Sequence, residues 1–388
     1  MEIYLDNSAT TRICSEALEK YIEVSNSTYG NPSSLHGMGL YAERELKLAR
    51  AAILGTLGDK TSSVIFTASG SEANNLAIIG RAFSKERYRN GARIITTDSE
   101  HASVFSPLDA LEKMGFEIVK VPTRGGVIDA DALSAALTKN VILVTVMHVN
   151  NETGALYNIP QVSKLMREKS PDAFLHIDAT QSYLKIPFTK KSLGADMITV
   201  SSHKIEGPKG VGALIVDPNV IKSRGLSPII LGGGQEQGLR SGTENVPAVA
   251  AFGVAARIGY SALLANSQKC LALKTRLIEK LSGEEFSGIS ITSPPSAAPH
   301  ILNITLPSIK SETMLHFLSS VGIYVSSGSA CSSNSQHISS ALTAFGRSAD
   351  EADCSIRISF SHRNTEGDVD AICKALAEGL SRLARKSR

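Results

Sequence analysis

The chain has 388 residues, 42% of them hydrophobic, with 40 basic and 37 acidic side chains and a net charge of +3. That length exceeds one small core and predicts a large and a smaller domain. The nearly balanced charge argues against direct nucleic-acid binding, and no apolar run is long enough to cross a membrane.

The cysteines are too few and too scattered for a disulfide framework. They are Cys14, Cys270, Cys331, Cys354 and Cys373. Their odd number and the lack of any C-x-x-C pair argue against paired disulfides and against a zinc module, so we expect no metal site. The N-terminus begins without an apolar signal region, and we expect a reducing, cytoplasmic setting.

Short β-branched runs alternate with segments of helical period in the first 216 residues. The predicted strands are 63–67, 93–97, 117–121, 141–149, 174–177, 197–200 and 212–216. The predicted helices between them include 72–85, 104–114, 130–137 and 159–169. This alternation predicts a mostly parallel sheet covered on both faces, and the apolar run 141–144 is typical of a strand buried on both sides.

The pattern changes near residue 248. It is helical to about residue 280, and strands then resume at 289–291, 301–306 and 355–360. The change predicts a second, smaller α+β domain. We therefore expect an N-terminal arm over 1–15 that joins the small domain, a large domain over 16–259 and a small domain over 260–388.

Polar residues follow three of the predicted strands, at the edge where open α/β sheets bind ligands. Ser69–Glu72 opens a helix whose N–H groups suit a phosphate, although the same residues suit a plain helix cap. Asp178 closes an apolar strand and needs a cation, donors or a structural ion pair. Lys204 precedes a Gly/Pro-rich turn, where a lysine is either a desolvated nucleophile or a surface charge.

Together, these three features are the parts needed to hold pyridoxal 5'-phosphate. A helix N-terminus takes the phosphate, a carboxylate keeps the pyridine nitrogen protonated, and a lysine bonds the aldehyde. The protonated ring then serves as an electron sink.

Ordered motifs extend this reading over nearly the whole chain. They are Tyr4–Thr11, Gly30–Ser34, Met147–Glu152, Asp178–Gln181, His203–Gly210, Arg240–Thr243 and Ser326–Cys331. With these motifs the chain resembles the cysteine desulfurases of the NifS/IscS type, a branch of the class V aminotransferases of fold type I. The resemblance implies an α/β fold, with a large domain that binds pyridoxal phosphate on a mainly parallel sheet and a smaller α+β domain that carries a catalytic cysteine.

The resemblance also gives roles to matching positions. The implied catalytic residues are Lys204, which attaches the coenzyme and moves the substrate Cα proton, His101, which stacks on the ring, and Cys331. The implied coenzyme-binding residues are Gly70, Ser71, His101, Asn151, Asp178, Gln181, Ser201, His203, Lys204 and Thr243. Asn151 and Arg357 would receive the substrate carboxylate. Taken alone, His101 and Arg357 fit structural roles, so their assignment depends on the resemblance.

Cys331 lies in the Ser/Gly-rich run Ser326–Ser335, for which the composition predicts a mobile loop. A free cysteine is commonly a small buried hydrophobe, whereas an exposed thiol can ionise and reach a substrate. The resemblance implies that free L-cysteine loses its sulfur, giving L-alanine and a persulfide on Cys331.

The resemblance further implies a homodimer with shared active sites, in which Thr243 reaches the neighbouring subunit's phosphate, and a sulfur-acceptor protein. The chain ends at Arg388 without the long tail of the iron–sulfur members. An iron–sulfur scaffold and a tRNA-thiolation enzyme therefore both remain open as acceptors. A selenocysteine lyase, another class V aminotransferase and a non-catalytic partner or scaffold are the alternatives.

Overall fold

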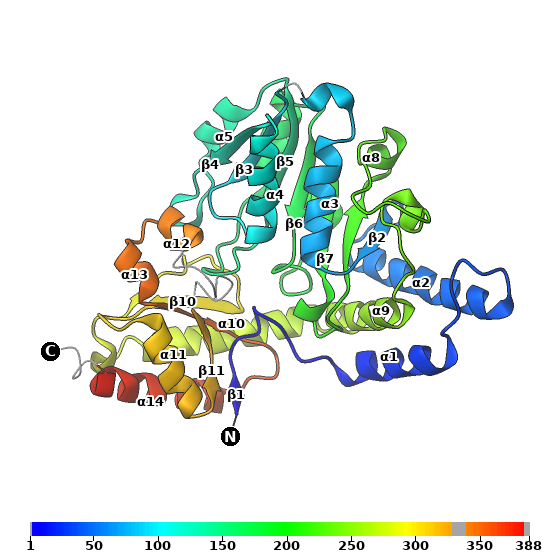
Figure 1. Cartoon of the computed structure of the whole chain (residues 1–388). Coiled ribbons are helices and arrows are strands. Elements are labelled where there is room, and N and C mark those ends of the chain that lie inside the picture. The colour runs from blue at the N-terminus through cyan, green and yellow to red at the C-terminus, as the bar shows by residue number, and fades with distance from the viewer. Residues whose placement is uncertain (1, 90, 328–338, 384–388) are drawn as a thin grey trace.

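Seven strands form the larger of the two main sheets (Figure 1). The computed structural model describes residues 2–89, 91–327 and 339–383. The strand order is β2 (Ser63–Thr67), β8 (Gly212–Val216), β7 (Met197–Ser201), β6 (Phe174–Asp178), β5 (Val141–Met147), β3 (Arg93–Thr97) and β4 (Glu117–Val121). All pairings are parallel except those of β8, which runs antiparallel to β2 and β7. The predicted mainly parallel sheet is confirmed.

Helices cover both faces of this sheet, because the strand residues that point to either face are apolar. Ile65 and Leu214 pack with α3 (Gly70–Ala82), α4 (Ala102–Lys113) and α8 (Pro218–Lys222) on one face. Val64 and Ile215 pack on the other face with helices from both ends of the domain. Those helices are α1 (Ser15–Ser27), α2 (Gly37–Thr56), α5 (Ala130–Ala136), α6 (Ile159–Lys169), α7 (Lys190–Leu193) and α9 (Val246–Ser261). Strands buried on both faces need this double cover.

The smaller sheet is antiparallel and has one apolar and one polar face. Its order is β12 (Ser326–Ser327), β13 (Ser355–Ser359), β10 (Ile301–Thr305) and β9 (Ser290–Ile291). Ile304 and Ile356 pack against α10 (Leu263–Lys280), α11 (Ser311–Ser320) and α14 (Glu366–Leu383). The alternate residues Asn303 and Arg357 face the large sheet, where they contact the segment after β5. This alternation turns a polar surface toward the carboxyl ends of the large-sheet strands.

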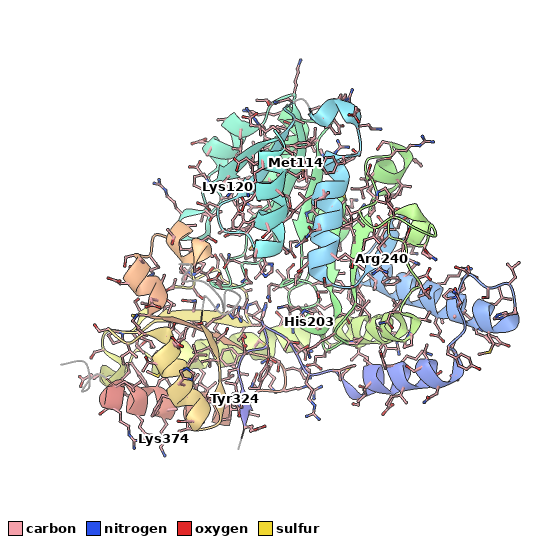
Figure 2. All side chains as sticks on the ribbon, in the orientation of Figure 1. Met114, Lys120, His203, Arg240, Tyr324 and Lys374 are labelled. Atoms are coloured by element: carbon pink, nitrogen blue, oxygen red, sulfur yellow. The ribbon has the colours of Figure 1, made fainter. Side chains whose placement is uncertain are left out.

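The N-terminal arm joins the two sheets. Strand β1 (Ile3–Tyr4) pairs in parallel with β11 (Ile323–Tyr324), and Ile3 and Leu5 belong to the apolar core of the smaller sheet. The chain then crosses to the large sheet, where Thr11 N donates to His203 O at 2.9 Å. Figure 2 labels His203 near the middle of the molecule, between the two sheets. The arm therefore passes beside the residue that precedes Lys204.

The predicted division between residues 259 and 260 falls inside the last turn of α9. The chain bends by 69° between α9 and α10, close to this division, which stays a prediction. Two short helices, α12 (Ser340–Ala344) and α13 (Ala349–Asp353), precede β13. No single helix within the described ranges is long and apolar enough to cross a membrane, and the bent pair α9 and α10 qualifies by length and composition only.

Candidate active site

The strands that carry the predicted site residues end at one edge of the large sheet. Strand β6 ends at Asp178 and β7 ends at Ser201, followed by a single 3-10 turn over Ser202–Lys204. His101 comes shortly after β3, and Asn151 comes shortly after β5. Because these strands are parallel, their carboxyl ends place His101, Asn151, Asp178 and Lys204 at the same edge of the sheet.

The Lys204 side chain is held by the N-terminal arm. Nζ donates to the carbonyl oxygen of Ala9 at 2.8 Å and to that of Ser8. Gln181 Nε2 donates to the same Ser8 carbonyl at 2.9 Å. The arm thus positions two predicted coenzyme residues through its backbone, a contribution that no side-chain pattern in the sequence indicates.

Asp178 is buried and oriented by two donors. Its Oδ1 accepts from Thr180 N at 2.9 Å, and its Oδ2 accepts from Asn74 Nδ2 at 2.8 Å. Asn74 lies on the buried face of α3 and also donates to Ser103 Oγ at 2.8 Å. Sequence reasoning missed Asn74; its signal is a polar residue among the apolar positions of that helix face.

His101 caps α4, where Nδ1 accepts from Ser103 N at 3.1 Å. Burial lowers the pKa of His101, the Lys204 charge lowers it further, and Asp178 opposes both. The imidazole is therefore neutral near pH 7, and acceptance at Nδ1 places its proton on Nε2.

A small-residue cradle lies where β2 leads into α3. A Cβ added to Gly70 would stand 3.3 Å from both Thr180 Oγ1 and the Ser201 Cβ, so these residues converge closely. Ser201 Oγ is buried and has no hydrogen-bond partner among the described residues. The first N–H groups of α3 lack intrahelical acceptors, and that of Glu72 donates to the N-cap Ser69 Oγ at 3.1 Å. Ser71, in the first turn, is exposed.

His203 lies beside the cradle residues but bonds to the arm. Its Nδ1 is 3.1 Å from Thr10 Oγ1. Burial lowers the pKa of His203 to about 4, with smaller contributions from Lys204 and Lys209. A neutral imidazole at this position offers a hydrogen bond rather than a charge.

The second part of the site belongs to the smaller sheet. Arg357 Nη1 donates to the backbone oxygen of Asn151 at 2.8 Å, and Nη2 pairs with Asp6 Oδ1 at 2.8 Å. The two residues predicted to receive a substrate carboxylate therefore meet. Asp6, to which the sequence reading gave no role, already supplies a carboxylate to Arg357.

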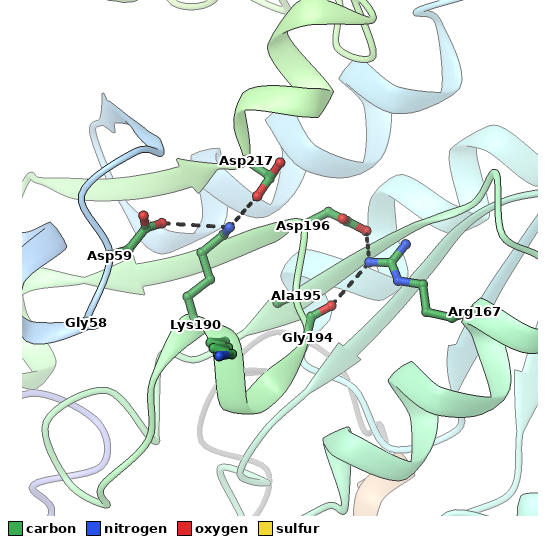
Figure 3. A pocket seen from close by; sticks show the side chains of 9 residues that line it. Gly58, Asp59, Arg167, Lys190, Gly194, Ala195, Asp196 and Asp217 are labelled. Atoms are coloured by element: carbon green, nitrogen blue, oxygen red, sulfur yellow. Dashed lines mark hydrogen bonds and ion pairs between the residues drawn. The ribbon is translucent and has the colours of Figure 1, made fainter.

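A separate pocket lies at the opposite edge of the large sheet (Figure 3). Lys190 pairs there with Asp217 at 2.5 Å and with Asp59 at 3.7 Å, and Arg167 pairs with Asp196 at 2.7 Å. Asp196 precedes β7, whereas Lys204 follows it. These charges neutralise one another, and the pocket lies at the far end of the strand from the lysine.

Comparison with known proteins identifies the family. The sequence matches Aminotransferase class-V over residues 3–372. It is 39% identical over 385 residues to a NifS/IcsS protein homolog of Lactobacillus delbrueckii subsp. bulgaricus, covering 97% of this chain and 96% of that protein. It is 35% identical to Cysteine desulfurase IscS 1 of Archaeoglobus fulgidus, covering 99% and 98% of the two chains. The solved structure of a NifS-like protein superposes with a TM-score of 0.91 at 34% identity, covering 98% of this chain and all of that one.

The chain belongs to the class-V aminotransferase family. Its resemblance to NifS/IscS-type proteins covers 97% of the chain in sequence and 98% in structure.

Members of this family use pyridoxal phosphate, and the residues present fit that group. The unpartnered Ser201 Oγ and the Gly70 cradle suit a phosphate, and Asp178 offers a carboxylate to the pyridine nitrogen. Lys204 follows the end of β7, which lies next to β6, the strand that carries Asp178. This class-V site therefore has one group for each part of the coenzyme.

Thr243 is the predicted residue of the described ranges that stays apart from this set. Cys331 lies outside the described residues. Thr243 is exposed on the loop before α9, and no contact joins it to the other candidates in the part of the chain that the structure describes. That loop is held near α3 by Arg240, whose Nε donates to Glu72 Oε1 at 2.8 Å. Figure 2 labels Arg240 on the side of the molecule where α2 and α3 lie.

Proposed function

We propose that this class-V protein is a cysteine desulfurase. It takes sulfur from free L-cysteine, releases L-alanine and holds the sulfur as a persulfide on Cys331. The relative from Archaeoglobus fulgidus carries the name cysteine desulfurase. The observation that carries the proposal is the meeting, at one sheet edge, of the Lys204, Asp178 and Gly70 region with Arg357 from the other sheet.

Each residue has a task that follows from its position. Pyridoxal phosphate, when bound, draws electrons away from the substrate Cα. Asp178, fixed by Asn74 and Thr180, would hold the ring nitrogen of the coenzyme with its carboxylate. Lys204 takes the Cα proton. Arg357 binds the substrate carboxylate and so fixes which bond of the amino acid faces the lysine.

The thiol of Cys331 is proposed to receive the sulfur. Its thiolate attacks the substrate sulfur, so that an S–S bond forms and the substrate Cβ–S bond breaks. The electron pair stays on the substrate carbon skeleton, which is protonated to alanine. The atoms balance as cysteine plus thiol giving alanine plus persulfide, with no external oxidant or reductant.

The described residues on either side of the cysteine support this role. Ser326 pairs with Arg357 across β12 and β13. Ser339 donates to Glu152 Oε2 at 2.5 Å, and Glu152 follows Asn151 in the chain. Cys331 comes four positions after Ser327, a reach of roughly 14 Å at full extension. Both ends of the cysteine-bearing segment are therefore attached beside the proposed carboxylate site.

Replacement of Cys331 tests the proposal. Cys331→Ala should abolish alanine formation from L-cysteine and the mass gain of one sulfur atom that wild type shows after brief exposure to substrate. Cys14→Ala, which changes a buried cysteine outside the site, is the control and should leave both signals intact. Undiminished alanine formation by the Cys331→Ala variant would contradict the proposal and favour another class V activity.

We also propose the acceptor and the setting that the sequence implied. A second protein, either an iron–sulfur scaffold or a tRNA-thiolation enzyme, receives the sulfur in the cytoplasm. Support comes from the unpaired state of the four cysteines in the described ranges, which suits a reducing compartment. Trapping Cys331 as a mixed disulfide in whole cells would identify the acceptor.

We propose that two copies form a homodimer. Support comes from large apolar side chains that are exposed along the first two helices and a nearby loop: Leu18, Ile22, Tyr29, Leu35, Leu40, Tyr41, Leu48 and Leu231. Glu236, in the loop that leads to Thr243, pairs with Arg50 of α2 at 2.7 Å. The apolar residues and Thr243 therefore share one side of the molecule, as a shared active site requires.

A further inference from the structure

Arg357 uses only part of its hydrogen-bonding capacity within the protein. Its side chain is 7% exposed. Nη1 donates to Asn151 O and Nη2 to Asp6 Oδ1, both at 2.8 Å. Nε is buried and has no hydrogen-bond partner among the described residues. Because Nε and Nη2 share one edge of the planar guanidinium, the edge that suits a two-point carboxylate is half occupied by Asp6.

The backbone of Asp6 is held by hydrogen bonds, whereas its carboxylate is partly exposed to solvent. Asp6 forms a parallel bridge with Ser359, and its carbonyl accepts from Ala9 N at 3.0 Å. Arg357 is the one side-chain partner of Asp6 within the described ranges, and the Asp6 side chain is 20% exposed. A rotation about its side-chain bonds would move the carboxylate from the guanidinium to water while the arm stays in place.

We propose that Asp6 is a built-in competitor of the substrate carboxylate at Arg357 and thereby sets specificity. The inference depends on the proposed role of Arg357 in substrate binding. In the free protein, Asp6 prevents a buried cation from standing without a counter-charge. An α-carboxylate can take both Nε and Nη2, whereas Asp6 holds only Nη2, so the two-point ligand displaces the one-point ligand.

This arrangement rejects ligands that lack the carboxylate. An amine or thiol alone cannot bond the shared edge, and it leaves the pair of Asp6 and Arg357 closed. A carboxylate ligand must displace Asp6 from Arg357, and this competition weakens the binding of the ligand. In return, only a ligand that bonds both Nε and Nη2 can bind. Loss of the Asp6 charge should therefore strengthen carboxylate binding selectively.

Three probes separate this role from a structural one. L-Cysteine carries carboxylate, amine and thiol, 3-mercaptopropionate lacks the amine, and cysteamine lacks the carboxylate. In the coenzyme-loaded protein, Asp6→Asn should lower the dissociation constant of 3-mercaptopropionate, measured by calorimetry, and the KM for L-cysteine, each about tenfold. The affinity for cysteamine, read from the coenzyme absorbance, should stay unchanged.

Asp370→Asn is the matched control. Asp370 pairs with Arg276 at 3.0 Å and with Lys280 at 3.1 Å on the outer side of the small domain, so this variant makes the same charge change away from the site. It should alter none of the three affinities. Asp6→Ala, which removes the carboxylate without leaving an amide, should repeat the Asp6→Asn pattern, and melting temperatures verify that both variants fold.

Two outcomes would overturn the inference. One is an unchanged 3-mercaptopropionate affinity in both Asp6 variants. The other is a parallel loss of affinity for all three probes, as a distorted site would give. Failure of the proposed function is a separate result: wild-type protein would form no alanine from L-cysteine, whereas its affinity for 3-mercaptopropionate could still respond to Asp6→Asn.

Discussion

Asn74 connects one helix to the charge that the coenzyme ring needs. Its amide donates at 2.8 Å both to Asp178 Oδ2 and to Ser103 Oγ, so it links the carboxylate to the turn that positions His101. A hydrogen bond to a charged, buried group is worth more than one between neutral groups. Asn74 is thus a positioning residue for Asp178 rather than a reacting group.

Asn74→Ala should weaken coenzyme binding. Loss of one donor to the Asp178 carboxylate should raise the dissociation constant of pyridoxal phosphate roughly tenfold. Titration of coenzyme-free protein, followed by absorbance, measures the change. Asn219→Ala, on an exposed position of α8, is the control and should bind as wild type. Equal affinities of the Asn74→Ala variant and wild type would show that Asp178 needs no such support.

Glu152, which bonds to Ser339 after the cysteine-bearing segment, makes the stability of the folded protein depend on pH. Burial raises the pKa of Glu152 to about 7, against the opposing influences of Ser339 and Arg357. The folded protein therefore keeps a proton on Glu152 that the unfolded chain releases near its ordinary pKa of 4.5. The contribution of Glu152 to the free energy of unfolding is fully present below pH 4.5. It is lost as the pH rises through about 7.

Glu152→Gln should remove this loss, because the amide does not titrate and its oxygen still accepts from Ser339. Between pH 5 and pH 8, the free energy of unfolding of the variant should gain about 2 kcal/mol relative to wild type. Urea unfolding at both pH values measures it. Glu168→Gln, on the exposed side of α6, should show no such difference. A pH-independent gap between Glu152→Gln and wild type would refute the assignment.

Strand β8 packs closely against the backbone of the phosphate cradle. It is the one antiparallel strand of the large sheet, and Gly212 at its start packs beneath the turn into α3. A Cβ there would lie 2.5 Å from the carbonyl carbon of Ser69 and 2.7 Å from Gly70 N. Both atoms are backbone, so neither can yield without moving the helix start.

Gly212→Ala should therefore impair coenzyme binding, with a loss of affinity of at least about tenfold as the cradle shifts. Gly55→Ala is the matched control, because Gly55 lies in α2 and a Cβ there meets nothing within 4 Å. That control should bind the coenzyme normally and raise stability by up to about 1 kcal/mol. Normal coenzyme affinity in Gly212→Ala would show that the turn tolerates the shift.

At the scale of the whole molecule, the exposed apolar residues point to assembly. Leu35 is 96% exposed and Leu231 is 80% exposed, both on the side that carries α2 and the Thr243 loop. Burying such residues against a second copy removes apolar surface from water. The proposed dimer would place Thr243 of one copy toward the cradle of the other.

The double variant Leu35→Glu, Leu231→Glu should convert a dimer to a monomer at micromolar concentration, with a dimer dissociation constant raised at least about 100-fold. Sedimentation measures the mass, and coenzyme affinity should fall with it because the site is shared. Met114→Glu changes an exposed residue at the C-terminal end of α4, in the upper part of Figure 2, and should leave the dimer intact. A monomeric wild type would contradict the proposed assembly.

The sequence alone determined the large sheet with few errors. The strands at 63–67, 93–97, 117–121 and 212–216 match β2, β3, β4 and β8, because each is a short run rich in β-branched residues between turn residues. The strand predicted to Val149 ends at Met147, and Val149 instead forms an antiparallel bridge with Leu156 as the chain turns back. The coenzyme and the polar strand ends could also be predicted, because strand order places those ends at one edge.

Only the tertiary structure decided the contacts that orient the site. Asp6 and Arg357 are 351 residues apart, Asn74 and Asp178 are 104 apart, and Lys204 and Ala9 are 195 apart. Local periodicity reports which face of an element is buried, but it carries no information on which distant segment covers that face. The path of the N-terminal arm between the two sheets, and with it the carboxylate that meets Arg357, follows from packing between distant parts of the chain.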